Sequence, residues 1–158
     1  MGRSPELALG VERYQDLYGK VLKGIIGENY EDELVEFLRQ QGWISNGKIP
    51  QMRFPLDRHE GSKARYLYDF PNGDDQILFQ LLRPGGKTSR HYHRSPVFEE
   101  YLPFSGSFYL NGVVIPPEGQ IVLPGFVHQG ESRDGWSTTF IKMRNIKNIP
   151  RDQWHIKV

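Results

Sequence analysis

The chain has 158 residues, among them 20 Lys and Arg, 19 Asp and Glu and no Cys, so its formal net charge is +1. A balance this close to zero gives no electrostatic reason to expect binding to nucleic acid or to an anionic membrane. The absence of Cys excludes disulfides, thiolate catalysis and thiolate metal ligands. No apolar run approaches the roughly 20 residues of a membrane span, and the N-terminus lacks a secretory signal pattern. We therefore expect a globular cytoplasmic protein with one domain spanning residues 1–158.

Residues 1–45 form a segment in which helices are predicted. A second helix is expected to begin at Asn29 and to end before Gly42, a natural residue for the left-handed position after a helix, with Trp43 folding back on Leu38. This helix is acidic, which argues against a DNA-binding helix pair. We interpret the whole segment as a helical extension that packs on a β-barrel. In the first helix, an apolar stripe at steps of three and four is formed by Leu7, Val11, Tyr14, Leu17, Val21 and Ile25.

From residue 50 onward the sequence predicts β-structure. Short runs rich in Val, Ile, Phe, Tyr and Leu are separated by Pro, Gly and Asn. Asn111-Gly112 joins two of these runs, and this dipeptide strongly favours the type I′ turn of a β-hairpin. Many short strands spaced by turn residues are typical of a sandwich or a barrel. The predicted strands are Arg65–Phe70, Gln76–Leu82, Val97–Leu102, Ser107–Leu110, Val113–Ile115, Gln120–Leu123 and Trp136–Arg144.

Three of the five His residues and an acidic residue form a candidate metal site. His91 and His93 are two residues apart, so on a strand both imidazoles project to the same side. Glu99 or Glu100, at the start of the next run, could return a carboxylate to the same ion, and His128 offers a third imidazole after a Pro-Gly turn. Three neutral nitrogens and one carboxylate suit divalent Fe, Mn, Co, Ni, Cu or Zn and suit Ca poorly.

The stretch around the first two of these histidines resembles the first sequence motif of the cupin superfamily. That motif runs Gly, five residues, His-x-His, three or four residues, Glu, six residues and Gly. Here five residues separate His93 from the acid, one more than the common pattern allows. Glu99 is preferred over Glu100 because only Glu99 keeps the six-residue distance to the final glycine. The matching residues are Gly85, His91, His93, Glu99 and Gly106.

A later stretch is similar to the second cupin motif. Gly119 opens it, Pro124-Gly125 forms a turn and His128 follows, while Ser132 stands where the family often has Asn. The resemblance covers roughly residues 76–145. It implies a mainly β fold, a small double-stranded β-helix (jelly-roll) barrel over residues 50–158, preceded by the N-terminal helical segment. It also implies a divalent transition-metal ion held by His91, His93, Glu99 and His128.

Other polar residues receive weaker interpretations. Tyr101 shares the inward face with Glu99, so it either contacts a substrate as an acid or hydrogen-bond donor, or fills the barrel. Lys142 either holds an anionic substrate or lies on a solvated strand face. Ile141 and Met143, on the other face of the same strand, are expected in the barrel core. No role is assigned to His59 or His155. Residues on the strand face opposite the histidine pair, which we exclude from the site, are Arg90, Tyr92 and Arg94.

Two classes of function are consistent with the resemblance. The first is a metal-dependent enzyme acting on a small organic molecule, as a dioxygenase or as an isomerase or lyase, and the reaction type stays open. The second is a non-catalytic module that binds or senses a small molecule or a metal. A third and weaker reading is a metal-independent isomerase of sugar phosphates or nucleotide sugars. It would need several convergent Arg or Lys for the phosphate, and the sequence does not assign Lys87, Lys142 or Arg144 to such a set. Similar barrels often dimerise by pairing sheet edges, so a homodimer is also compatible with the sequence.

Overall fold

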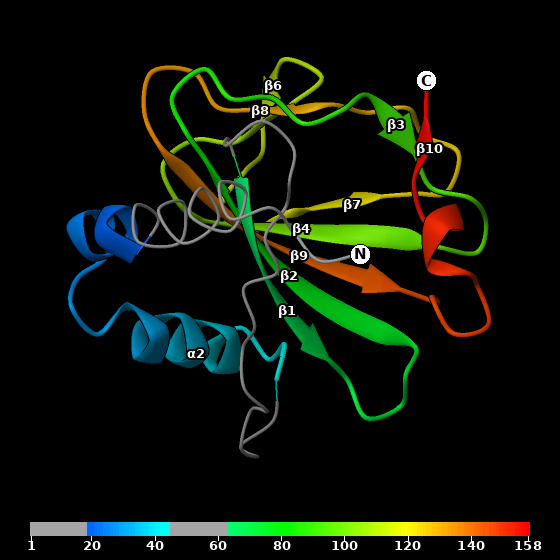
Figure 1. The fold of residues 1–158 in the computed structure, drawn as a ribbon, viewed down its shortest axis with the longest axis horizontal. Coiled ribbons are helices and arrows are strands. Elements are labelled where there is room, and N and C mark those ends of the chain that lie inside the picture. The colour runs from blue at the N-terminus through cyan, green and yellow to red at the C-terminus, as the bar shows by residue number, and fades with distance from the viewer. Residues whose placement is uncertain (1–18, 45–62) are drawn as a thin grey trace, which may run out of the picture. The chain divides into compact units, whose positions relative to one another are not determined.

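The structure is a computed structural model that describes residues 19–44 and 63–158 (Figure 1). The chain divides into two compact units, Met1–Met52 and Arg53–Val158, and each is described by itself. Most of the predicted first helix and His59 lie outside the described residues. No helix among the described residues is long and apolar enough to cross a membrane.

In the first unit, helix α2 (Tyr30–Gln40) matches its prediction more closely than the helix before it does. Helix α2 begins directly after the predicted start. Gly42 has a φ of +74°, and the Trp43 N–H donates to the Leu38 carbonyl at 2.9 Å. This is the glycine-based helix end that the sequence predicts. The apolar stripe predicted for the first helix is wrong at Ile25. This residue is 37% exposed, because the helix before α2, residues 19–25, ends there.

The second unit is mainly β, as the sequence predicts, and its strands pair antiparallel. Its largest sheet has five strands in the order β1-β2-β9-β4-β7. Two smaller sheets lie along one side of it, with the orders β6-β5-β8 and β10-β3 (Figure 1). The bounds are β1 (Lys63–Asp69), β2 (Asp75–Leu82), β3 (His91–Tyr92), β4 (Phe98–Ser105), β5 (Tyr109–Leu110), β6 (Val113–Val114), β7 (Gln120–Val122), β8 (Gly130–Glu131), β9 (Ser137–Arg144) and β10 (Ile156–Lys157), with a 3-10 turn at Arg151–Gln153.

The hairpin between β5 and β6 confirms the predicted type I′ turn. Asn111 and Gly112 have φ values of 51° and 78°, and both must be positive in this turn. The two-residue strands β8 and β10 fall outside every predicted run, because neither has enough apolar residues to form a pattern. Strand β3 also ends one residue earlier than the His-x-His interpretation assumes, so His93 lies just beyond it.

The core of the second unit lies between the large sheet and the two small ones. Ile141 and Met143 on β9 face this core, as predicted, and the register places Met143 beside Glu99. Lys142 lies on the other face of β9 and is half-buried, with its Nζ 5.0 Å from the centre of the Phe70 ring. The core residues are Leu78, Leu82, Val97, Tyr101, Phe108, Leu110, Ile115, Val122, Ile141, Met143 and Ile146.

Candidate metal centre

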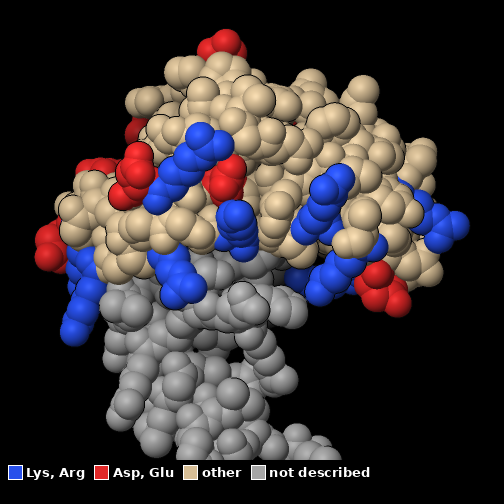
Figure 2. Space-filling view, turned by 90° about the horizontal axis from the view of Figure 1, so that it is seen from above, with Lys and Arg blue, Asp and Glu red and all other residues tan. Residues whose placement is uncertain are grey.

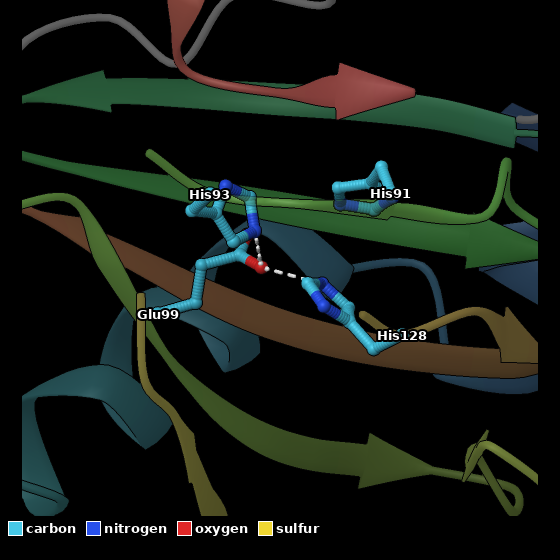
Figure 3. Close-up of side chains that lie close together, drawn as sticks. All are labelled: His91, His93, Glu99 and His128. Atoms are coloured by element: carbon cyan, nitrogen blue, oxygen red, sulfur yellow. Dashed lines mark hydrogen bonds and ion pairs between the residues drawn. The ribbon is translucent and has the colours of Figure 1, made fainter. Parts of the chain in front are cut away.

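Four side chains that are far apart in the sequence converge inside the second unit. One ligand atom from each of His91, His93, Glu99 and His128 lies within 4.8 Å of the others. Figure 3 shows the imidazoles of His93 and His128 on either side of the Glu99 carboxylate, with His91 close by. None of the four is more than 7% exposed. They form the only group of this kind among the described residues.

Backbone pairing explains how the two histidine segments meet. His91 and His128 form an isolated antiparallel bridge in which each N–H donates to the carbonyl of the other, at 3.0 and 2.8 Å. The Gly125 N–H donates to the His93 carbonyl at 2.9 Å and extends this pairing. The imidazole ring centres of His91 and His128 are therefore only 4.3 Å apart. Glu99 reaches the same point from β4, which lies between β9 and β7 in the large sheet.

Each imidazole is oriented by a backbone carbonyl at its Nδ1 atom. Since a carbonyl only accepts hydrogen bonds, each Nδ1 carries the hydrogen and each Nε2 faces the cluster. This second hydrogen bond is typical of histidines that bind metal ions through Nε2. The three pairs, each 2.8 Å apart, are His91 with Ser89, His93 with Trp154, and His128 with Phe126.

The cluster contains more acceptors than donors, which is the arrangement a cation requires. The Nε2 atom of His91 is buried and has no hydrogen-bond partner among residues 19–44 and 63–158. Glu99 Oε1 lies 3.2 Å from Nε2 of His128 and forms a very short contact with Nε2 of His93. A buried lone pair without a partner is costly, so the group fits a divalent metal ion.

The pKa values reflect the same crowding. Burial lowers the pKa of His91 to about 4, so this imidazole is neutral near pH 7. Burial also opposes the charged form of His93, but the hydrogen bond and negative charge of Glu99 outweigh it and raise the pKa of His93. Burial opposes ionisation of Glu99 too, yet hydrogen bonds with His128 and His93 hold its pKa well below the usual range. Glu99 therefore stays ionised, which is the form in which a carboxylate binds a metal ion.

The carboxylate that faces the imidazoles is Glu99 and not Glu100. Glu100 points to the opposite side of β4, where its Oε1 lies 3.4 Å from Nη1 of Arg144. Tyr101 lies on the same side as Glu99, and its hydroxyl donates to Oε1 of Glu99 at 2.9 Å. The ring of Tyr101 stacks on Phe108 with centres 5.6 Å apart, so it both fills the core and contacts the site.

The structure also brings to the site two residues that sequence reasoning missed. His155 lies beside the cluster and is half-buried, with its ring centre 4.9 Å from that of His91 and 4.8 Å from that of His93. Trp154 supplies the carbonyl that orients His93. Both precede β10, whose pairing with β3 had no sequence signal. The exposed side chains of Arg90 and Arg94 agree with their exclusion from the site.

Comparisons with known proteins identify the fold. No protein-family model matches the sequence, and no curated protein matches it. Among solved structures, an RmlC-like cupin protein from Ralstonia eutropha is 14% identical, with a TM-score of 0.53 over 66% of this chain and 71% of that one. The polyketide cyclase RemF from Streptomyces resistomycificus is 16% identical, with a TM-score of 0.53 over 73% and 85% of the two chains. KdgF from Halomonas sp. is 12% identical, with a TM-score of 0.52 over 66% and 97%. Together with the two histidine motifs, these similarities show that the chain has the fold of the cupin superfamily.

Proposed function

We propose that this protein is a metal-dependent enzyme that acts on a small organic molecule. The observation that carries the proposal is the convergence of three Nε2 atoms and one carboxylate oxygen within 4.8 Å, all buried. A structural polar cluster would be expected to satisfy its own hydrogen bonds. Here the Nε2 atom of His91 has no hydrogen-bond partner in the part of the chain that the structure describes, which supports binding of an added ligand.

The donor set limits the ion and the chemistry. Three imidazoles and one carboxylate suit divalent Fe, Mn, Co, Ni, Cu or Zn. Such an ion would supply Lewis acidity toward a substrate oxygen or, if it is redox-active, oxygen chemistry. With neutral imidazoles and one carboxylate, a divalent ion leaves the centre with a net positive charge. A substrate with an anionic or enolisable oxygen group is therefore favoured there.

The residues around the centre would orient the substrate and exclude water. Tyr101 holds the Glu99 carboxylate in place through its hydroxyl, so Glu99 cannot turn away when a substrate enters. The ring of Phe108, stacked on Tyr101, forms an apolar wall beside it. Tyr101 is also our candidate for a catalytic residue, since its hydroxyl is the nearest neutral proton donor to Glu99 among the bonds described. Dioxygenase chemistry and isomerase or lyase chemistry both fit this arrangement.

The test is metal analysis of protein purified without a His tag and without chelator. We expect close to one transition-metal ion per chain in the wild type and a sharp loss in His91→Ala and His128→Ala. His59→Ala, the same substitution elsewhere in the chain, should keep its metal. Equal metal in all the variants would refute the ligand assignment.

The identity of the metal and a substrate screen then decide the reaction class. Turnover that requires O₂ would support a dioxygenase, whereas turnover without O₂ would support an isomerase or a lyase. Tight ligand binding without turnover across a broad panel would replace the enzyme with the alternative, a binding or sensing module.

A further inference from the structure

A pocket opens beside the two chain segments that carry His91 and His128. It has a volume of about 340 Å³, within the lower range of small-ligand sites. Its walls come from the segment before β3, the turn between β5 and β6, and the segment that leads into and includes β8. The residues that line it are Lys87, Arg90, Asn111, Gly112, Val127, Gln129 and Glu131.

Hydrogen bonds hold the walls of this pocket in place. The side chain of Asn111 donates to the Val127 carbonyl and accepts from the Gln129 N–H, both at 3.0 Å. The side-chain amide of Gln129 donates to the Thr88 carbonyl at 2.9 Å. The pocket is therefore formed before any ligand arrives, and little ordering is needed on binding.

The charges in the pocket favour an anion. Lys87 and Arg90 are exposed, and neither has an ion-pair partner among the described residues. The carboxylate in the pocket, Glu131, has its Oε1 atom 3.3 Å from Nη2 of Arg133. The pocket therefore contains two cations, Lys87 and Arg90, and one carboxylate, whose negative charge is already neutralised by Arg133.

This positive charge is local. Figure 2 looks onto the molecule from the side on which Figure 1 shows β6 and β8, and there Lys and Arg are dispersed among Asp and Glu. A dispersed pattern does not suit a polyanion such as nucleic acid, which needs a continuous basic surface. It suits a small ligand that is held at one point.

The pocket is separate from the metal centre, although residues of the same two chain segments contribute to both. Arg90 directly precedes His91, and Val127 directly precedes His128. Successive side chains of an extended segment point to opposite sides. Thus the histidines face the core, where they are buried, while Arg90 faces the pocket and solvent.

We propose that this pocket binds a small oxyanion, a carboxylate or a phosphate, through Lys87 and Arg90. The guanidinium offers the paired N–H groups that match two oxygens of such a group, and the ammonium adds a point charge. The proposal does not depend on the metal centre or on its chemistry.

The experiment is a titration of the full-length, metal-loaded protein with inorganic phosphate and, separately, with succinate. Binding is followed by calorimetry and by amide NMR shifts. We expect saturable binding that shifts the amides of Gly112 and Gln129, and the tighter of the two probes shows whether phosphate or carboxylate is preferred. In Lys87→Gln/Arg90→Gln, affinity should fall at least about tenfold, since charged hydrogen bonds are lost.

Two controls keep the result interpretable. Lys20→Gln/Lys147→Gln removes the same charge from exposed lysines outside the pocket and should change affinity less than about twofold. His93→Ala disrupts the metal centre and should still bind the probe, which separates this proposal from the proposed function. The proposal is overturned if the wild type shows no saturable binding, if other amides shift instead, or if the pocket variant binds as well as the wild type.

Discussion

The hydrogen bond between Tyr101 and Glu99 gives a direct test of how the candidate metal centre is supported. Tyr101→Phe removes only the hydroxyl that donates to Oε1 of Glu99 at 2.9 Å. Tyr101 and Glu99 are 4% and 2% exposed, so water cannot readily replace the lost donor. The ring stays stacked on Phe108 and no large cavity forms.

The size of the effect follows from the charge of the acceptor. A hydrogen bond to a charged group contributes about 1.5–3 kcal/mol, more than a neutral one. We therefore expect the free energy of unfolding of the metal-free protein at pH 7 to fall by that amount, measured by urea unfolding with an unchanged m-value. Competition with a chelator should also show a metal affinity about tenfold weaker, because the carboxylate is no longer held in place.

Tyr109→Phe is the matched control for this substitution. Tyr109 is half-buried and its ring lies 4.0 Å from the guanidinium carbon of Arg133, away from the cluster. Its substitution should change stability by less than about 0.5 kcal/mol. If Tyr101→Phe is also within that range and binds metal as tightly as the wild type, the hydroxyl does not support Glu99 and our interpretation of the site is wrong.

Three further predictions concern packing, pH and the C-terminus. In Gly130→Ala the new Cβ would lie 2.3 Å from Cζ of Phe108, so urea unfolding should show a loss of about 1–3 kcal/mol, whereas Gly135→Ala, with open space around it, should be close to neutral. Burial holds the pKa of His91 near 4, against 6.5 when unfolded, so its contribution to stability is complete above pH 6.5 and is lost as the pH falls toward 4. The metal-free wild type should therefore lose about 2–3 kcal/mol more than His91→Asn between pH 7 and pH 4.5, and parallel losses would contradict this. Deletion of residues 154–158 should weaken metal binding at least as much as Tyr101→Phe, as judged by the same chelator competition, and unchanged affinity would show that the C-terminus does not support the site.

Much of the fold was predictable because its determinants are local in the sequence. Positive φ values at Asn111-Gly112 are needed for the type I′ turn, and few other residue pairs adopt them easily. The alternation of side chains along β9 indicated which residues face the core, and Met143 does so. By contrast, the two-residue strands β8 and β10 have no periodicity to detect, and backbone pairing with distant segments creates them.

The metal ligands of the candidate site were also predictable from local spacing, but the residue that orients His93 was not. The resemblance to the cupin motifs selected Glu99 over Glu100 by spacing alone, and the structure places Glu99 beside the imidazoles. Two of the three imidazole orientations are also local, since His91 and His128 each use the carbonyl two residues earlier. No spacing rule applies to Trp154, which is 61 residues from the histidine that it orients.

The distant carbonyl of Trp154 makes the C-terminal strand part of the site and not only part of the fold. Strand β10 pairs with β3, and the Val158 N–H donates to the Arg90 carbonyl at 3.1 Å, which fixes the segment in register. That register sets the position of the Trp154 carbonyl and therefore the hydrogen on Nδ1 of His93. If β10 detached, His93 would be free to rotate or change tautomer, and Nε2 would no longer be held as a ligand. Since any metal that binds only the assembled centre stabilises it by mass action, docking of the C-terminal strand and metal binding must stabilise each other.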